Sequence, residues 1–190
     1  LPNGVKIEKR VSKNDSSSGL YFKKNNAGFS KNTSNSSLFN QAEQLDNLLK
    51  INNLFEKSYY LIEFEPDFNC GQSIEIHNVF QSDKARLQQQ RLLFLLNPGA
   101  CVKIIEQHVC LSKTSCFQNS VSEIICSKNS FLEHVFIQQG RQNSCLVKSL
   151  FVTQKRDSKS MFHNFSLSGK LSRNNYHINL TESFSETNVF

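Results

Sequence analysis

LLFLLNPGACVKIIEQHVCL, from Leu92 to Leu111, opens a series of short apolar runs and polar turns that continues to Gly169 and decides the fold. The runs that follow are VSEIIC (121–126), FLEHVFIQQ (131–139), CLVKSLFVT (145–153) and MFHNFSLSG (161–169). They are rich in Val, Ile, Leu and Phe, and clusters of Gly, Pro, Asn and Ser bound them, which is typical of β-strands rather than helices. The stretch therefore predicts a domain built from strands.

A fixed spacing connects these runs. Cys101, Phe131 and Met161 each open a predicted strand and stand 30 residues apart. A second series starts at Val121, Leu146 and Tyr176, with steps of 25 and 30 residues. A repeat of this size is typical of a solenoid, whose units bury their apolar faces only by stacking on neighbours. An antiparallel sandwich or barrel is the alternative, although it spaces strands more closely, about every 8 to 12 residues.

The chain divides into two parts. Residues 1–58 contain a strand after the turn LPNG, an Asn/Ser-rich stretch from Lys13 to Ser37 that we expect to be a mobile insertion, and helix-like Leu spacing from Leu38 to Lys57. That helix is expected to cover the open end or one face of the strand stack. Residues 59–190 form the β-helix core, with further strands at 59–66, 73–80, 176–180 and 188–190. Since the last strand stops without a polar cap, we expect a chain truncated at its C-terminal end.

Charge and hydropathy exclude several function classes. The formal charge is +6, yet the Lys and Arg residues form only small clusters, which favours a solvated surface over nucleic-acid binding. No apolar run is long enough to span a bilayer, and no secretory signal pattern is present, so a soluble protein that binds no membrane is expected.

The cysteines suggest free thiols, because a chain of 190 residues can bury a core without disulfides. The six are Cys70, Cys101, Cys110, Cys116, Cys126 and Cys145. Strand alternation puts His108 and Cys110 on the same face, as two metal ligands would require. They are the weak candidates for a metal site, and the competing interpretation is a partly buried His beside a core Cys.

No catalytic signature is present: GxGxxG, GxxxxGK[ST], HExxH and GxSxG are all missing from the sequence. Five His residues lie inside predicted strands, namely His77, His108, His134, His163 and His177. Glu106 with His108 and Glu133 with His134 recur at similar points of successive units. They could serve acid-base chemistry, but a stacked polar ladder on the outer face is the plainer interpretation. A β-helix carbohydrate-active enzyme would gather several Asp on a concave face, whereas Asp67, Asp83 and Asp157 lie in or beside turns.

On these residues the chain resembles the SufB/SufD family of the SUF iron–sulfur cluster assembly system, and its SufD branch in particular. The resemblance is carried by NPGACVKIIEQHV, NSVSEIICSKNSFLEHVFIQ and FVTQKRDSKSMFHNFSLSGKLSRNNYHINL, between Leu92 and Phe190, and more weakly by LPNGVKI and by SLFNQAEQLDNLL to SIEIHNVF. These are strand and turn patterns in a particular order rather than a catalytic motif.

The resemblance implies a right-handed parallel β-helix (solenoid) with a short N-terminal helix, pairing with a SufB-like subunit and a SufC-like ATPase as a scaffold without turnover of its own. No cluster-ligating residue is carried over. An iron–sulfur cluster is expected only at an interface shared within the complex, in the cytoplasm or a plastid-like organelle. A homodimer stays open, as do a β-helix carbohydrate-active protein and a generic solenoid binding module.

Overall fold

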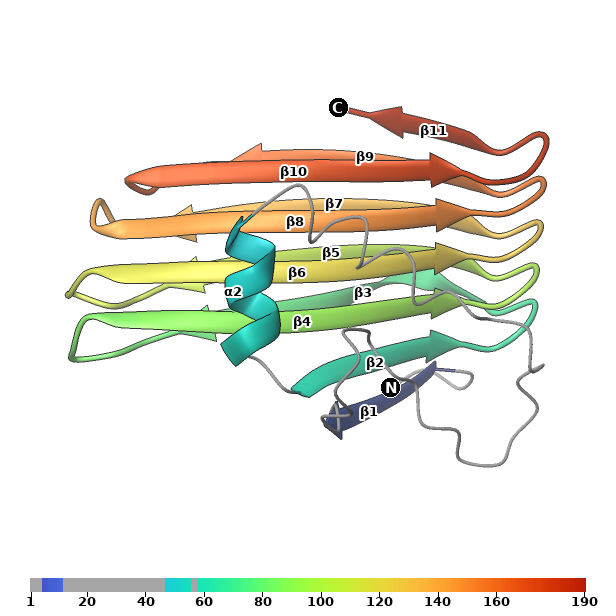
Figure 1. Ribbon diagram of the computed structural model, residues 1–190. Coiled ribbons are helices and arrows are strands. Elements are labelled where there is room, and N and C mark those ends of the chain that lie inside the picture. The colour runs from blue at the N-terminus through green and yellow to red at the C-terminus, as the bar shows by residue number, and fades with distance from the viewer. Residues whose placement is uncertain (1–4, 12–46, 56–57) are drawn as a thin grey trace.

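The computed structural model describes residues 5–11, 47–55 and 58–190, which form a β-solenoid of two sheets with a helix on its side (Figure 1). The first sheet contains β1 (Val5–Val11), β2 (Ser58–Phe64), β4 (Arg86–Leu96), β6 (Cys116–Cys126), β8 (Ser144–Gln154) and β10 (Leu171–Leu180), in that order. The second contains β11 (Glu186–Val189), β9 (Lys159–Ser166), β7 (Phe131–Gly140), β5 (Cys101–Cys110) and β3 (Asn69–Phe80).

Successive strands from β2 onward alternate between the two sheets, so each coil contributes one strand to each sheet. All neighbours within the sheets are parallel except β1, which pairs antiparallel with β2. The solenoid expected from the sequence is therefore confirmed, and the antiparallel sandwich is wrong.

The register agrees with the first sequence series only in part. Cys101 pairs with Phe131, as the repeat of 30 predicts. Met161 pairs with Glu133 instead of Phe131, so the next step is two residues shorter than expected.

The second series is wrong at both steps: Val121 pairs with Ser149 and not with Leu146, and Tyr176 pairs with Leu150 and not with Leu146. The turns explain the first difference: residues 111–115 join β5 to β6, whereas only 141–143 join β7 to β8. Strand β6 also begins earlier than expected, at Cys116 instead of Val121. The sequence spacing between the first residues of successive strands thus gives the approximate length of the repeat, but not which residues pair across neighbouring strands.

The turns on the right-hand edge of Figure 1 stack on one another through backbone hydrogen bonds. In each of them one residue adopts positive φ: Asp67 (57°), Gly99 (75°), Asn129 (59°), Asp157 (58°) and Phe184 (59°). Gly, Asn and Asp tolerate this conformation best, which is why NPGA and SKNS separate the strands. A Cβ at Gly99 would lie 2.0 Å from Asp67 Oδ1, so glycine is needed there for space as well.

The interior changes character along the strands. Toward the C-terminal ends of β4, β6 and β8 it is apolar, with Phe94, Ile124 and Val152 adjacent in register and fully buried. Toward the other end of the same strands, the equivalent row holds Gln90, Ser120 and Lys148. The interior therefore has an apolar end, toward the C-terminal ends of these strands, and a polar end, toward their N-terminal ends. Both terms refer to the direction along the strands and not along the solenoid axis.

Helix α2 (Asn47–Phe55) lies across the outer face of the six-stranded sheet, over β4 and β6 (Figure 1). Leu49 packs against Val121 and Phe151, and the Asn52 side chain donates a hydrogen bond of 2.9 Å to the Asn119 carbonyl. The expected covering helix is thus present over its C-terminal part. Its predicted first residues, 38–46, and the expected insertion at 13–37 lie outside the described residues.

Candidate functional site

Four ionisable side chains meet inside the solenoid, at the start of its polar end; we call Glu106, His108, His134 and Lys148 the Glu106 cluster. Glu106 and His108 are two residues apart on β5, so both point inward. His134 comes from the neighbouring strand β7, and Lys148 from β8 in the opposite sheet. All four side chains are buried.

Glu106 is the centre of the cluster. Its Oε1 lies 2.8 Å from Nε2 of His108, and its Oε2 lies 3.0 Å from Nε2 of His134. The ammonium group of Lys148 forms an ion pair with the same Oε2. It also stands over the ring of Phe136, 4.1 Å from the ring centroid, in a cation–π contact. The carboxylate of Glu106 therefore contacts three nitrogen atoms, one from each of the other members of the cluster.

A second layer of polar groups extends this network toward β3 and β4. The side-chain amide of Asn78 lies 2.9 Å from Nε2 of His108, and Gln90 donates a hydrogen bond to Asn78. Because buried polar groups cost free energy unless they are paired, such a connected network is the expected way to hold ions in a solenoid core.

Burial and charge shift the pKa of each member. Burial alone would raise the pKa of Glu106, but the Lys148 ammonium and the hydrogen bonds from His108 and His134 outweigh it, and the pKa stays well below its usual range. Burial lowers the pKa of both imidazoles and of Lys148, against the opposing attraction of Glu106. The arrangement is that of an ionised carboxylate with neutral imidazoles around it.

The same contacts bear on the imidazole tautomers. At His134, where only the carboxylate faces Nε2, a neutral imidazole carries its proton there, which leaves Nδ1 as an unprotonated acceptor. Nε2 of His108 lies between the Glu106 carboxylate, an acceptor, and the amide nitrogen of Asn78, a donor, so either tautomer of His108 finds one partner there. Within residues 58–190, no hydrogen-bond partner reaches Nδ1 of His108 or of His134. The Glu106 cluster can thus hold a buried ion pair and can take up protons at two ring nitrogens.

The structure puts the metal candidates His108 and Cys110 on one inward face of β5, as strand alternation predicts. It does not bring them into a common site, because His108 bonds Glu106 and Cys110 packs with Phe80 and Cys116. Among the residues that the structure describes, no group of three or more His, Cys, Asp and Glu side chains is arranged to hold a metal.

The ladder expected from Glu106, His108, Glu133 and His134 is wrong in its location, because three of the four point inward. Glu133 alone lies on the outer face, where its carboxylate is 2.8 Å from the Lys103 ammonium. The error arises because a strand of this sheet shows its polar residues to both sides, and periodicity alone does not tell inside from outside.

Five of the six cysteines have described side chains and all five are free thiols: Cys101, Cys110, Cys116, Cys126 and Cys145. Burial and a contact with Cys110 raise the pKa of Cys116 to about 12, and burial raises that of Cys126 to about 12. Burial therefore disfavours the thiolate, the nucleophilic form, at both of these thiols.

Sequence reasoning missed Lys148. A usable signal was present, since CLVKSLFV places a single Lys within an otherwise apolar strand that is buried on both faces. A Lys in such a position needs an acidic partner, and Glu106 is that partner.

The three Asp residues that a carbohydrate-active site would require do not gather. Asp67 and Asp157 lie in the turns of one edge, and Asp83 lies in a turn of the opposite edge. Fold and interior together thus define a parallel β-solenoid protein with a closed, charge-paired core.

The chain belongs to the SufBD core family: the model for the SUF system FeS cluster assembly, SufBD core domain, matches residues 78–190. The match begins near the end of β3 and covers every later strand, including the whole Glu106 cluster. The chain thus carries the core domain of a family that is named for the SUF system of iron–sulfur cluster assembly.

One curated relative is Protein ABCI7, chloroplastic, of Arabidopsis thaliana, which is 28% identical over 99 residues. The match covers 52% of this chain but only 21% of the relative, so this chain spans a small part of that protein. No solved structure matches significantly. Across residues 5–11, 47–55 and 58–190, no helix combines the length and hydropathy needed to cross a membrane.

Proposed function

We propose that the chain is a SufD-type scaffold subunit of a SUF assembly complex, which pairs with a SufB-like subunit and works with a SufC-like ATPase. The family match over residues 78–190 is the observation that carries the proposal. It supports a role in cluster assembly. The finer assignment to the SufD type is supported by the sequence resemblance described above.

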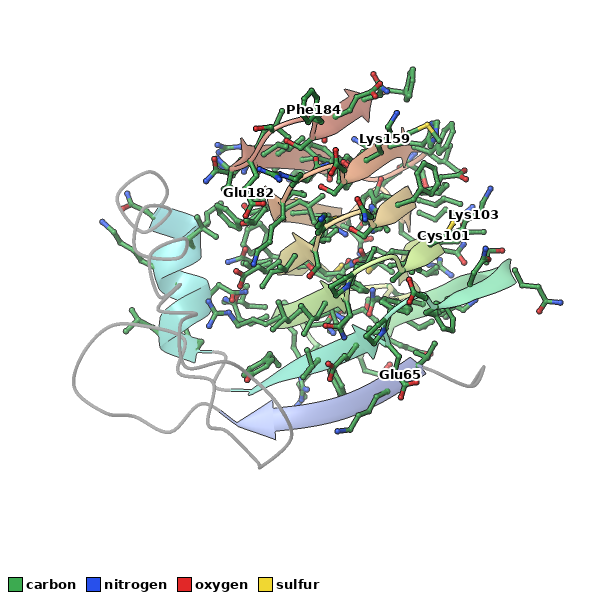
Figure 2. The ribbon with its side chains drawn as sticks, turned by 90° about the vertical axis from the view of Figure 1, so that its right-hand side faces the viewer. Glu65, Cys101, Lys103, Lys159, Glu182 and Phe184 are labelled. Atoms are coloured by element: carbon green, nitrogen blue, oxygen red, sulfur yellow. The ribbon has the colours of Figure 1, made fainter. Side chains whose placement is uncertain are left out.

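The end of the solenoid formed by β10 and β11 supports a role in pairing. Each of these strands is the last in its sheet among the described residues. Four exposed apolar side chains lie on this end: Leu180, Phe184, Val189 and Phe190. Figure 2 shows Phe184 at the top of the strand stack. Exposed apolar side chains gathered in this way are typical of a surface that a partner protein covers.

A scaffold role without turnover fits the interior. The Glu106 cluster is buried among apolar side chains, with the rings of Phe94 and Phe162 in T-shaped contact with the His134 ring. Its carboxylate, the two Nε2 atoms and the ammonium group contact one another inside the core. In this proposal the iron–sulfur cluster is cargo, held at an interface shared with the partner and not by ligands of this chain alone.

We further propose a plastid-like organelle as the place of action, in preference to the cytoplasm. The support is that the Arabidopsis relative is a chloroplast protein. Organelle fractionation with an antibody to this chain tests it, and recovery in the cytosolic fraction alone would contradict it.

The test of the scaffold is affinity capture of this chain co-expressed with a SufB-like subunit and a SufC-like ATPase, with iron and sulfide measured on the recovered material. Stoichiometric recovery of the SufB-like subunit is expected. A chain that is folded by circular dichroism and still captures neither subunit would refute the proposal.

A matched pair of variants locates the contact. Phe184→Glu places a charge on the β10–β11 end, where the side chain is 81% exposed, and is expected to reduce capture of the SufB-like subunit at least about tenfold, or about 1.4 kcal/mol. Phe55→Glu changes an equally accessible Phe, 70% exposed on α2, and should leave capture unchanged. Equal reductions in capture by the two variants would show that the SufB-like subunit does not bind at the β10–β11 end.

A further inference from the structure

One edge of the solenoid carries a cation in every described coil. The turns that join the second sheet to the first, on the left of Figure 1, contain or adjoin five exposed basic side chains: Lys84, Arg86, Lys113, Arg141 and Lys170. The one acidic residue in these described turns is Asp83. Within the described part of the chain none of the five basic side chains forms an ion pair. We call this set the basic edge.

The opposite edge is different in charge. Its turns contain four acidic residues, Glu65, Asp67, Asp157 and Glu182, and three basic ones, Lys128, Lys155 and Arg156. Figure 2 looks onto this opposite edge, where Glu65 and Glu182 lie among the side chains of the turns. The cations are therefore not spread evenly around the coils but concentrated at one edge.

An apolar row runs beside the basic edge. Leu87, Phe117, Cys145 and Leu171 are consecutive partners in register across β4, β6, β8 and β10. Leu87 is 48% exposed and Leu171 50% exposed, while Phe117 and Cys145 are half-buried. We call these four residues the apolar row. It lies on the outer side of the first sheet.

Three residues of the apolar row and two cations of the basic edge line one open groove. Arg86, Leu87, Phe117, Cys145 and Lys170 are among the residues that line it, and its volume is about 610 Å³. The lining includes the amide side chains of Gln142 and Asn143 but no carboxylate. The groove therefore offers apolar contact at its base and positive charge at both ends.

The spacing of the row fits a helix. Neighbouring strands of a sheet lie about 4.8 Å apart, and one turn of an α-helix rises about 5.4 Å. A helix laid along the solenoid axis consequently presents roughly one side chain of a given face to each coil. Helix α2 already packs in this way on the same sheet, where Leu49 contacts Val121 of β6 and Phe151 of β8 (Figure 1).

We infer that the apolar row and the basic edge form a docking groove for an acidic amphipathic helix of a partner protein. Apolar side chains of that helix, one per turn, lie over Leu87, Phe117 and Leu171, and its flanking carboxylates face the cations. A nucleic acid fits less well, since stacking platforms need exposed aromatic rings and Phe117 is half-buried. This inference does not depend on the SufD assignment.

The test is fluorescence anisotropy of the whole chain with a labelled helical peptide of about four turns, carrying Leu on one face and Glu beside it. The peptide is expected to bind, and its Glu→Gln version should bind at least about tenfold more weakly. Raising the salt from about 50 to about 300 mM should weaken only the Glu peptide, since surface charges are screened.

Three variants separate the groove from general charge attraction. Arg86→Glu with Lys170→Glu, the two cations that line the groove, is expected to lose at least about tenfold in affinity. Lys128→Glu with Arg156→Glu, on the opposite edge, should not. Leu87→Asn should also weaken binding without changing the charge. All five positions are exposed, so the fold should persist, which circular dichroism checks.

Other outcomes would overturn the inference. These are absence of peptide binding, equal losses from the two double variants, no loss in Leu87→Asn, or a labelled oligothymidylate that binds as tightly as the Glu peptide. The last result would identify the basic edge as a surface for polyanions in general.

Discussion

The two ends of the solenoid interior use the same strands in different ways. Around Phe94, Ile104 and Leu132 the core is apolar, and such a core tolerates hydrophobic substitutions of similar volume best. Around Glu106 each group has a particular partner, and Lys148 reaches it from the opposite sheet. The apolar end supplies most of the burial, while the polar end determines which residues must face each other.

The difference concerns register. If β8 slipped by two residues, the apolar end would still place aliphatic side chains inward, because its neighbours Leu150 and Val152 resemble each other. The same slip would separate Lys148 from Glu106 and bury both charges unpaired. We therefore infer that the Glu106 cluster fixes the alignment of the two sheets, at some cost in stability.

The largest effect is expected from breaking the cluster on one side. Glu106→Gln leaves the Lys148 ammonium buried without its counter-charge, and should cost about 3 to 5 kcal/mol in the free energy of unfolding. Urea denaturation measures it. The control Glu133→Gln removes the half-buried, outward-facing partner of Lys103 and should cost less than about 1 kcal/mol. Equal losses in the free energy of unfolding would show that the Glu106 cluster contributes no more to stability than the Lys103–Glu133 ion pair.

Replacing both charges sharpens the comparison. Glu106→Leu combined with Lys148→Met converts the centre of the polar end to an apolar one, and stability should be unchanged or up to about 4 kcal/mol greater. If the cluster fixes register, amide NMR spectra of this variant will show more than one set of signals for β7 and β8. A destabilised variant with a single set of signals would contradict both statements.

Acid should weaken the polar end first. The pKa values of His108 and His134 are lowered by burial, so below the ordinary imidazole value, about 6.5, the unfolded chain binds protons that the folded chain does not. Stability is then full above that value and falls as pH decreases toward the lowered pKa. Glu106, whose pKa is also lowered, adds a further loss below about 4.5.

The variant His134→Gln should make this loss between pH 7 and pH 5 smaller, whereas His77→Gln, at an exposed position on β3, should not. Urea midpoints at several pH values measure it. Burial raises the pKa of Glu123 to about 7, which gives the opposite trend over part of this range, so the two variants must be compared with each other. Identical pH slopes would contradict the role of His134.

The smallest effect is expected in the apolar end. Ile104→Val removes one buried methyl group and should cost about 0.5 to 1.5 kcal/mol, without any change in the number of NMR signals. A variant with heterogeneous signals would show that the apolar end also determines register.

The sequence was sufficient for the strands and the repeat, because apolar runs ending at NPGA or SKNS have few other interpretations. It was not sufficient for the pairing of Val121 with Ser149, which depends on a turn two residues shorter than its neighbour. Nor could it place the Glu106 cluster, whose members come from three strands and two sheets. Only Lys148, alone in an apolar strand, indicated that a buried charge pair was needed.

The pairing of each coil with the next has a consequence for how the chain folds. The partners Cys101 and Phe131 lie 30 residues apart, and the separation is similar at every later pairing. The entropy lost in closing each coil therefore depends on the length of one repeat and not on the length of the whole chain. Once one pair of coils has formed, growth can proceed one coil at a time along the axis, so the folding rate should depend mainly on the first pair.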